Sequence, residues 1–181
     1  MLAKMFGRLK LRINDIKTIK QLFSDAENYA QQQNEDLPGE EHILLAALDL
    51  PDGTARQVFE KLATNPATIV TSIQQQYTQA LSQLGFENSN LMSGLNGEGI
   101  EAADSGKLLY DAKPSVQSLM KALYEYKKKD KDRPLLGADI LAVLAEKEHG
   151  VAARTLEVLG IDREKLKLIV NEVLEQFRHH G

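Results

Sequence analysis

The stretch formed by residues 39–62 returns in degenerate form at residues 137–159, and no other feature restricts the possible folds as strongly. The two copies are separated by a constant offset of 97 residues, which pairs Ile43 with Ile140. The same offset relates Leu22 to Leu119, Tyr29 to Tyr126, Gly53 to Gly150, Leu62 to Leu159 and Ile73 to Val170. A fixed internal period indicates that one structural unit is used twice. We therefore predict a duplicated module.

The apolar residues of each copy recur at spacings of three and four, which predicts α-helices. Asn65 followed by Pro66, and Gly160 followed by Asp162, are typical signals for the ends and starts of helices. No segment shows the apolar and polar alternation of a β-strand. The predicted fold is all-α, with two four-helix repeats. In the first repeat the expected helices span residues 13–30, a shorter stretch from residue 40, residues 54–62 and residues 66–84.

Glycine content and charge divide the chain into four predicted parts. Residues 85–107 contain five glycines and no sustained apolar period, so we expect a flexible linker there. The glycines in this segment do not follow the spacing of a phosphate-binding loop. The predicted parts are residues 1–12 as a basic arm or helix extension, 13–84 as the first repeat, 85–112 as the Gly-rich linker and 113–181 as the second repeat.

The first thirteen residues alternate apolar and basic side chains without an uninterrupted apolar stretch. This pattern differs from that of a signal peptide, and no run in the sequence approaches the length of a membrane span. A helix extension or solvated arm explains the segment better than a helix lying on a membrane surface, which remains the alternative. The absence of Cys is consistent with a reducing compartment, and we expect a cytoplasmic protein.

The overall charge argues against two classes of partner. The formal net charge is −4 and the isoelectric point is about 5.6, so no general attraction to nucleic acid or anionic lipid is expected. The chain has no Trp and few aromatic residues, which disfavours a platform for stacking bases. We therefore expect neither a nucleic-acid nor a membrane partner.

The sequence offers no recognisable catalytic or metal-binding motif. None of the four His residues lies in HExxH or at a ligand spacing from another His, and no nucleophile motif or phosphate loop occurs. His42 follows Glu40 and Glu41 at a predicted helix start, where a hydrogen-bonding role is favoured over general-base chemistry. We expect no catalytic residue, no metal and no cofactor.

Two motifs carry a family resemblance. Residues 39–45, GEEHILL, resemble the G-T-E-H-I-L-L signature of the Clp amino-terminal repeat, and residues 150–156, GVAARTL, closely match its G-V-A-A-R-x-L helix. A weaker copy of the second motif stands at residues 53–56. Over residues 13–177 the chain thus resembles the double Clp repeat domain of Clp-family ATP-dependent unfoldases. The resemblance implies a pseudo-twofold all-α domain that docks protein substrates or adaptor proteins.

The resemblance also implies candidate binding residues at two helix starts. In some family members the Glu of each G-T-E-H motif reads phosphorylated arginine. Glu41 fills the first position, but the constant offset places Ala138 opposite it, and only a shifted alignment supplies Asp139. The sequence therefore argues against two symmetric phosphoarginine sites. We expect binding at a groove between the repeats and at exposed first turns, formed by Glu40, Glu41, His42, Ala138 and Asp139.

These observations favour a non-catalytic protein-binding module of Clp-linked protein quality control. No Walker motif occurs in the sequence, which resembles a free-standing Clp amino-terminal domain or the excised domain of a longer protein. Two alternatives remain open. One is a regulatory domain that binds the Clp ATPase or its adaptors without binding clients. The other is an enzyme with an unrecognised site.

Overall fold

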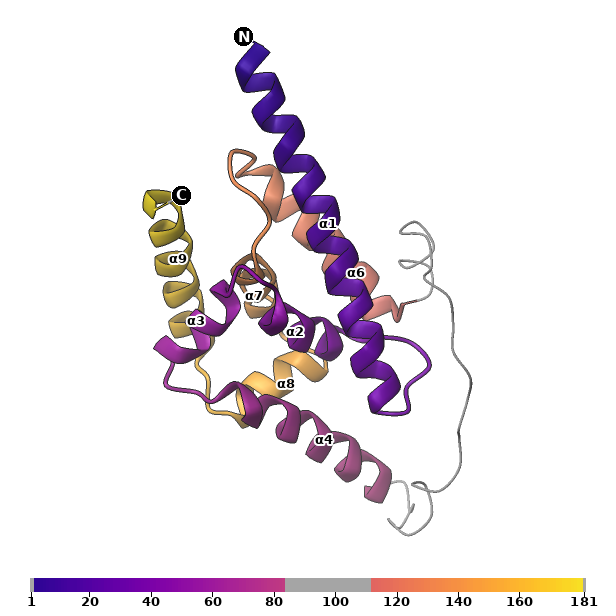
Figure 1. Ribbon diagram of the computed structural model, residues 1–181. Coiled ribbons are helices and arrows are strands. Elements are labelled where there is room, and N and C mark those ends of the chain that lie inside the picture. Colours follow the sequence, from indigo (N-terminus) through magenta and orange to yellow (C-terminus); the bar gives the residue numbers. More distant parts are fainter. Residues whose placement is uncertain (1, 84–111, 181) are drawn as a thin grey trace.

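The computed structural model describes residues 2–83 and 112–180, with side chains described for residues 10–78 and 112–179. Within these residues all regular structure is α-helical, which confirms the predicted all-α fold (Figure 1). The predicted Gly-rich linker, apart from Ala112, lies outside the described residues. The helices are α1 (Leu2–Gln32), α2 (Glu40–Asp49), α3 (Thr54–Lys61), α4 (Pro66–Gln83), α6 (Pro114–Lys128), α7 (Gly137–Ala145), α8 (Val151–Val158) and α9 (Arg163–His180).

The internal repeat of the sequence is also a repeat of the structure. Helices α2, α3 and α4 begin at residues 40, 54 and 66, and α7, α8 and α9 begin at residues 137, 151 and 163, so the offset of 97 holds for all three pairs. Equivalent positions are buried in both copies. The fully buried apolar pairs include Leu22 and Leu119, Ile43 and Ile140, Leu44 and Leu141, and Ile69 and Leu166.

The ends of the helices follow the signals in the sequence. Asn65 and Asp162 each accept a hydrogen bond from a first-turn amide, at 3.0 Å and 2.8 Å. Gly160, with φ +68°, ends α8 in the left-handed conformation that glycine adopts without cost. Its counterpart after α3 is Ala63, which adopts the same conformation with φ +56°. The two repeats therefore share this type of helix end, although only one of them uses glycine for it.

The two repeats form a single core. Helices α2 and α7 pack against each other at the centre, α4 of the first repeat packs on α8, and α9 of the second packs on α3 (Figure 1). Apolar residues from both repeats belong to one continuous cluster of buried side chains. The sequence predicts a groove between the repeats, but along α2 and α7 packed core fills that space.

Helix α1 is much longer than its counterpart α6. It begins at Leu2, whereas α6 begins at Pro114, the position equivalent to Lys17. Pro at the first helical position marks the start of α6, and no comparable start signal precedes Lys17, so the helix continues toward the N-terminus. The first half of α1 projects past the remaining helices (Figure 1). It meets the loop before α7 at Asp15, which accepts a hydrogen bond from the Leu135 amide at 2.6 Å.

Candidate functional site

The five candidate residues at the starts of α2 and α7 are all buried. Their exposed fractions are 1% for Glu40, 2% for Glu41 and 0% for His42, Ala138 and Asp139. The expectation that these first turns are exposed is therefore wrong. The reason is tertiary, because α2 and α7 pack against each other and against the helices around them. The acidic first turns lie inside the molecule instead of facing solvent.

Glu40 connects the two repeats. Its carboxylate forms an ion pair with Lys147, in the loop that follows α7. The same carboxylate occupies the space where a side chain at Gly150 would begin. Gly150 also has φ +114°, a conformation that L side chains rarely adopt. Two features therefore require glycine at the first position of the GVAAR motif: the backbone conformation of residue 150 and its close contact with Glu40.

Glu41 belongs to a polar cluster at the edge of the fold. The hydroxyl of Tyr77 donates a hydrogen bond to its Oε1 at 2.5 Å, and Lys113 Nζ lies 3.6 Å from the same atom. Lys113 also forms an ion pair with Glu35. Burial and the hydrogen bond to Glu41 raise the pKa of Tyr77 far above its ordinary value, so the phenol keeps its proton. The side chains of Lys113 and Glu35 are 32% and 24% exposed, so solvent reaches these two residues of the cluster although the side chain of Glu41 is only 3% exposed.

His42 and Asp139 perform the same structural task in the two repeats. The Gly39 amide donates to His42 Nδ1 at 2.9 Å, and the Leu136 amide donates to Asp139 Oδ2 at 2.9 Å. Each side chain thus caps the start of its own helix. Asp139 is the counterpart of His42, as the constant offset requires, and the counterpart of Glu41 is Ala138. The shifted alignment that would pair Asp139 with Glu41 is wrong.

Ala138 and Asp139 are fully occupied by contacts within the fold. The Ala138 amide donates to Thr54 Oγ1 of the first repeat at 2.9 Å. Arg133 binds both carboxylate oxygens of Asp139, each at 2.6 Å. Although burial acts in the opposite direction, the hydrogen bonds to Asp139 raise the pKa of Arg133, which stays charged. These two residues therefore stabilise the start of α7.

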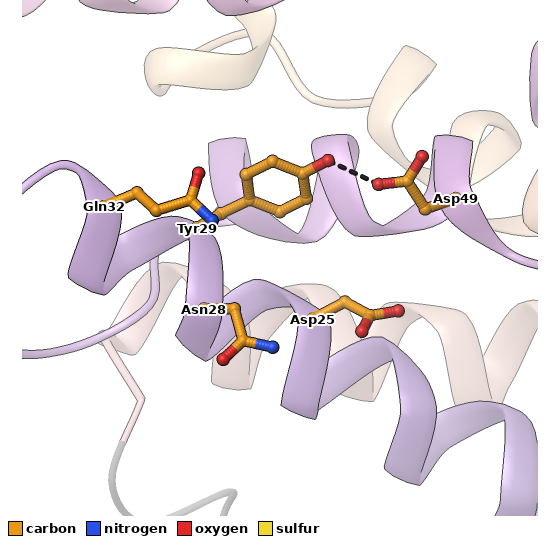
Figure 2. A pocket seen from close by; sticks show the side chains of 5 residues that line it. All are labelled: Asp25, Asn28, Tyr29, Gln32 and Asp49. Carbon is orange, nitrogen blue, oxygen red and sulfur yellow. Dashed lines mark hydrogen bonds between the residues drawn. The ribbon is translucent and has the colours of Figure 1, made fainter. Parts of the chain in front are cut away.

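An open depression of about 290 Å³ lies between α1 and the end of α2. In Figure 2 the phenol of Tyr29 points toward Asp49 and donates a hydrogen bond to it. Burial and this hydrogen bond raise the pKa of Tyr29 to about 12. The remaining lining residues are Asp25, Asn28 and Gln32 of α1. The lining is thus two carboxylates, two amides and one phenol, a surface suited to a cationic or hydrogen-bonding group.

Sequence reasoning did not find this depression. Its α1 residues are spaced as on one face of a helix, and polar residues with that spacing ordinarily form a solvated face. Asp49 comes from a different helix, twenty positions after Tyr29. The one available signal was Tyr29 itself, a phenol at the border of an apolar stripe. Such amphipathic side chains place a ring against the core and a hydroxyl at the surface.

Two further properties restrict the chemistry of the described residues. Among them, no group of three or more Asp, Glu or His side chains is placed to hold a metal ion. None of the described helices is both long and apolar enough to pass through a membrane.

Comparison with known proteins places this geometry in a family. Residues 17–130 match the model of the Clp repeat (R) N-terminal domain, a match that spans more than half of the chain. It begins within α1, contains α2, α3 and α4, and extends just past the end of α6. None of the curated proteins compared with the chain matches it. Because this match covers more than half of the chain and includes the GEEH turn, the chain belongs to the Clp repeat N-terminal domain family.

Proposed function

We propose that the protein is a non-catalytic protein-binding module that docks protein substrates or adaptors for a Clp unfoldase. Family membership supports a Clp-associated binding role. The observation that carries the docking proposal is the depression between α1 and α2, because it is open and each residue that lines it carries a polar group. A shallow polar surface suits a side chain presented by another protein, whereas small-molecule sites are ordinarily deeper and more apolar.

The partner that suits this depression carries a basic side chain. Asp25 and Asp49 supply negative charge, and the side-chain amides of Asn28 and Gln32 supply additional acceptors. Asp49 already pairs with Arg56, whose guanidinium also donates to the Leu48 carbonyl at 2.6 Å. An incoming Arg or Lys would therefore add a second cation to an acidic surface that holds one at its edge.

The first turn of α2 provides a second contact through Glu41. A cationic group of the partner that displaced Lys113 would approach the carboxylate of Glu41, and Tyr77 would hold that carboxylate in place. We assign Glu40, His42, Ala138 and Asp139 to the support of this turn and of its counterpart. The proposed binding residues thus come from the second half of α1 and from both ends of α2.

Binding assays with purified components test the proposal. The wild-type protein is expected to bind a Clp ATPase, an adaptor or an unfolded client protein, and each is measured separately by calorimetry. Asn28→Arg places a cation in the depression and is expected to weaken that binding at least about tenfold, through occupancy and charge repulsion. Glu125→Arg is the matched control, because residue 125 is the exposed equivalent of residue 28 on α6.

The outcomes separate the proposal from its alternatives. Binding to the ATPase or adaptor but to no client would favour a purely regulatory domain. Equal loss of binding in Asn28→Arg and Glu125→Arg would mean that the depression is not part of the binding site. Binding to none of the three classes would contradict the docking function itself.

A further inference from the structure

The first half of α1 precedes the region that matches the family. The family match begins at residue 17, and the repeat-related helix α6 begins at Pro114, the position equivalent to Lys17. Helix α1 nevertheless begins at Leu2 and projects beyond the other helices (Figure 1). We call residues 2–16 the helix extension. Two independent comparisons therefore place its boundary with the family domain at the same residue.

The helix extension exposes apolar side chains. Ile13 is 47% exposed and Ile16 is 54% exposed, although the same helix buries Leu22 and Ala26 completely where it meets the body. The spacing of three and four that predicts an apolar helical stripe continues through the sequence toward the N-terminus, at positions 2, 6 and 9. The described part of the extension thus leaves uncovered an apolar stripe that the body covers farther along α1.

Positive charges border this stripe on both sides. At 3.6 residues per turn, Arg12 falls on one side of the line through Ile13 and Ile16, while Lys10 and Lys17 fall on the other. All three cations are exposed, and within the described part of the chain none of them forms an ion pair. Residues 1–20 contain six Lys or Arg and one acidic residue, a net charge of +5 in a chain whose total is −4. The rest of the protein is accordingly acidic.

We propose that the helix extension binds an anionic membrane surface and lies in its plane. A helix with an apolar stripe bordered by cations inserts the stripe among lipid chains while the cations meet anionic headgroups. Headgroups supply negative charge on both sides of the stripe at once. A second copy of the chain would bring like charges together on both sides, and nucleic acid offers Ile13 and Ile16 no apolar surface. This proposal replaces the sequence-based expectation of no membrane partner and is independent of the proposed docking function.

The projection of the extension is compatible with the acidic body. Fifteen helical residues span about 22 Å, whereas charges are screened over about 8 Å at physiological salt. The extension can therefore contact an anionic surface while most of the acidic body remains beyond the range of strong repulsion. The docking depression, lined by residues of the second half of α1, stays on the body.

Vesicle flotation with the full chain tests the proposal. The wild-type protein is expected to float with vesicles containing phosphatidylglycerol, to remain unbound with phosphatidylcholine alone, and to be released by high salt. Lys10→Glu with Arg12→Glu is expected to lower the affinity at least about tenfold. Ile13→Asp with Ile16→Asp is expected to abolish binding. Circular dichroism and thermal melting establish that each variant is folded.

Matched controls use exposed residues of the body. Leu168→Asp, at a residue that is 70% exposed on α9, and Lys129→Glu with Lys131→Glu, after α6, are expected to leave vesicle binding unchanged. Because the chain has no Trp, Ile16→Trp introduces a single reporter whose emission is expected to shift to the blue with anionic vesicles. Leu168→Trp is expected to show no shift.

Three results would overturn the proposal. The first is no flotation of the wild-type protein with anionic vesicles. The second is equal binding to both types of vesicle at all salt concentrations. The third is a combination of two findings: the wild-type protein does not bind vesicles, and light scattering shows a wild-type dimer that the double variant Ile13→Asp with Ile16→Asp dissociates. A second copy of the chain would then be what covers the apolar stripe.

Discussion

His42 shows how a single buried side chain links the fold to pH. Its Nδ1 accepts a hydrogen bond from the Gly39 amide, so Nε2 carries the proton and faces Gln33 Oε1 at 3.4 Å. Burial lowers the pKa of His42, the carboxylate of Glu41 opposes this shift, and Lys113 reinforces it. The neutral imidazole is therefore the form that caps α2. A proton on Nδ1 would remove the acceptor that the cap requires.

Replacement of His42 is expected to change how stability depends on pH. In the unfolded chain His42 binds a proton near pH 6.5, whereas in the folded chain it is protonated only at a lower pH. The contribution of neutral His42 to the free energy of unfolding is therefore fully present above about pH 6.5 and is lost as the pH falls below that value. His42→Asn retains an acceptor for the Gly39 amide but does not titrate. Urea unfolding between about pH 7 and pH 5 is expected to show a shallower loss of stability in this variant, by up to about 1.4 kcal/mol per pH unit.

The exposed His149 provides the control for this experiment. His149→Asn is expected to lose stability with falling pH as the wild-type protein does. An unchanged slope in His42→Asn would mean that protonation of this imidazole does not oppose folding.

The pair formed by Arg133 and Asp139 gives a second prediction for single residues. Arg133 is 7% exposed and Asp139 is fully buried, so Asp139→Asn leaves a buried guanidinium without its bidentate partner and weakens the cap at Leu136. Breaking a buried pair in this way costs about 3 to 5 kcal/mol. Chemical denaturation is expected to show that loss, with a smaller effect for Asp130→Asn at the surface side of Arg133. A cost below about 1 kcal/mol would contradict the role assigned to the pair.

Helix ends show how the two copies of one element have diverged. Both α3 and α8 end with a left-handed residue, and the following amide returns to the last turn, from Thr64 to the Phe59 carbonyl at 3.0 Å in the first repeat. The second repeat places Gly160 at this position, whereas the first places Ala63 there. A β-carbon in this conformation costs roughly 1 to 2 kcal/mol. The first repeat therefore carries local strain that the second does not.

Ala63→Gly is expected to stabilise the protein. Removal of the β-carbon relieves that strain, partly offset by the greater entropy of glycine in the unfolded chain, for a net gain of about 0.5 to 1 kcal/mol. Thermal unfolding measures the gain. The reciprocal variant Gly160→Ala is expected to lower the melting temperature, and a loss of stability in Ala63→Gly would show that Ala63 makes compensating contacts.

At the scale of the whole molecule, the packing of the repeats predicts cooperative unfolding. Helix α4 packs on α8 of the other repeat and α9 packs on α3, so each repeat completes the core of the other. Leu44 and Leu141 are equivalent residues of the two repeats, and both are fully buried. Neither repeat can lose its core without exposing that of its partner.

Leu44→Ala and Leu141→Ala are each expected to cost about 2 to 5 kcal/mol, because each leaves a cavity in the shared core. Both variants are expected to unfold in one transition, observed by circular dichroism and calorimetry. Leu168→Ala, at an exposed position of α9, is expected to cost little. Two separate transitions in either core variant would mean that the repeats are independent domains.

Predictions about the candidate site depended on information that a sequence lacks. Acidic first turns of helices ordinarily face solvent, so the sequence predicts exposed turns that contain Glu40, Glu41, His42, Ala138 and Asp139. Their burial results from the contact between α2 and α7, two helices separated by almost one hundred residues. The depression beside Tyr29 was missed for the same reason, since Asp49 joins it only through the packing of α2 on α1. The hydrogen-bonding role predicted for His42 is confirmed, because its ring accepts from the Gly39 amide.

The sequence by itself determined the repeat, the all-α fold and most helix ends. These depend on local spacing, on Pro, Gly and cap residues, and on an offset that can be read along one chain. Tertiary structure alone decided which polar residues are buried, which helix of one repeat covers the other, and where α1 leaves Ile13 and Ile16 uncovered. The physical reason is that burial is a property of two surfaces, and the sequence of a helix specifies only one of them.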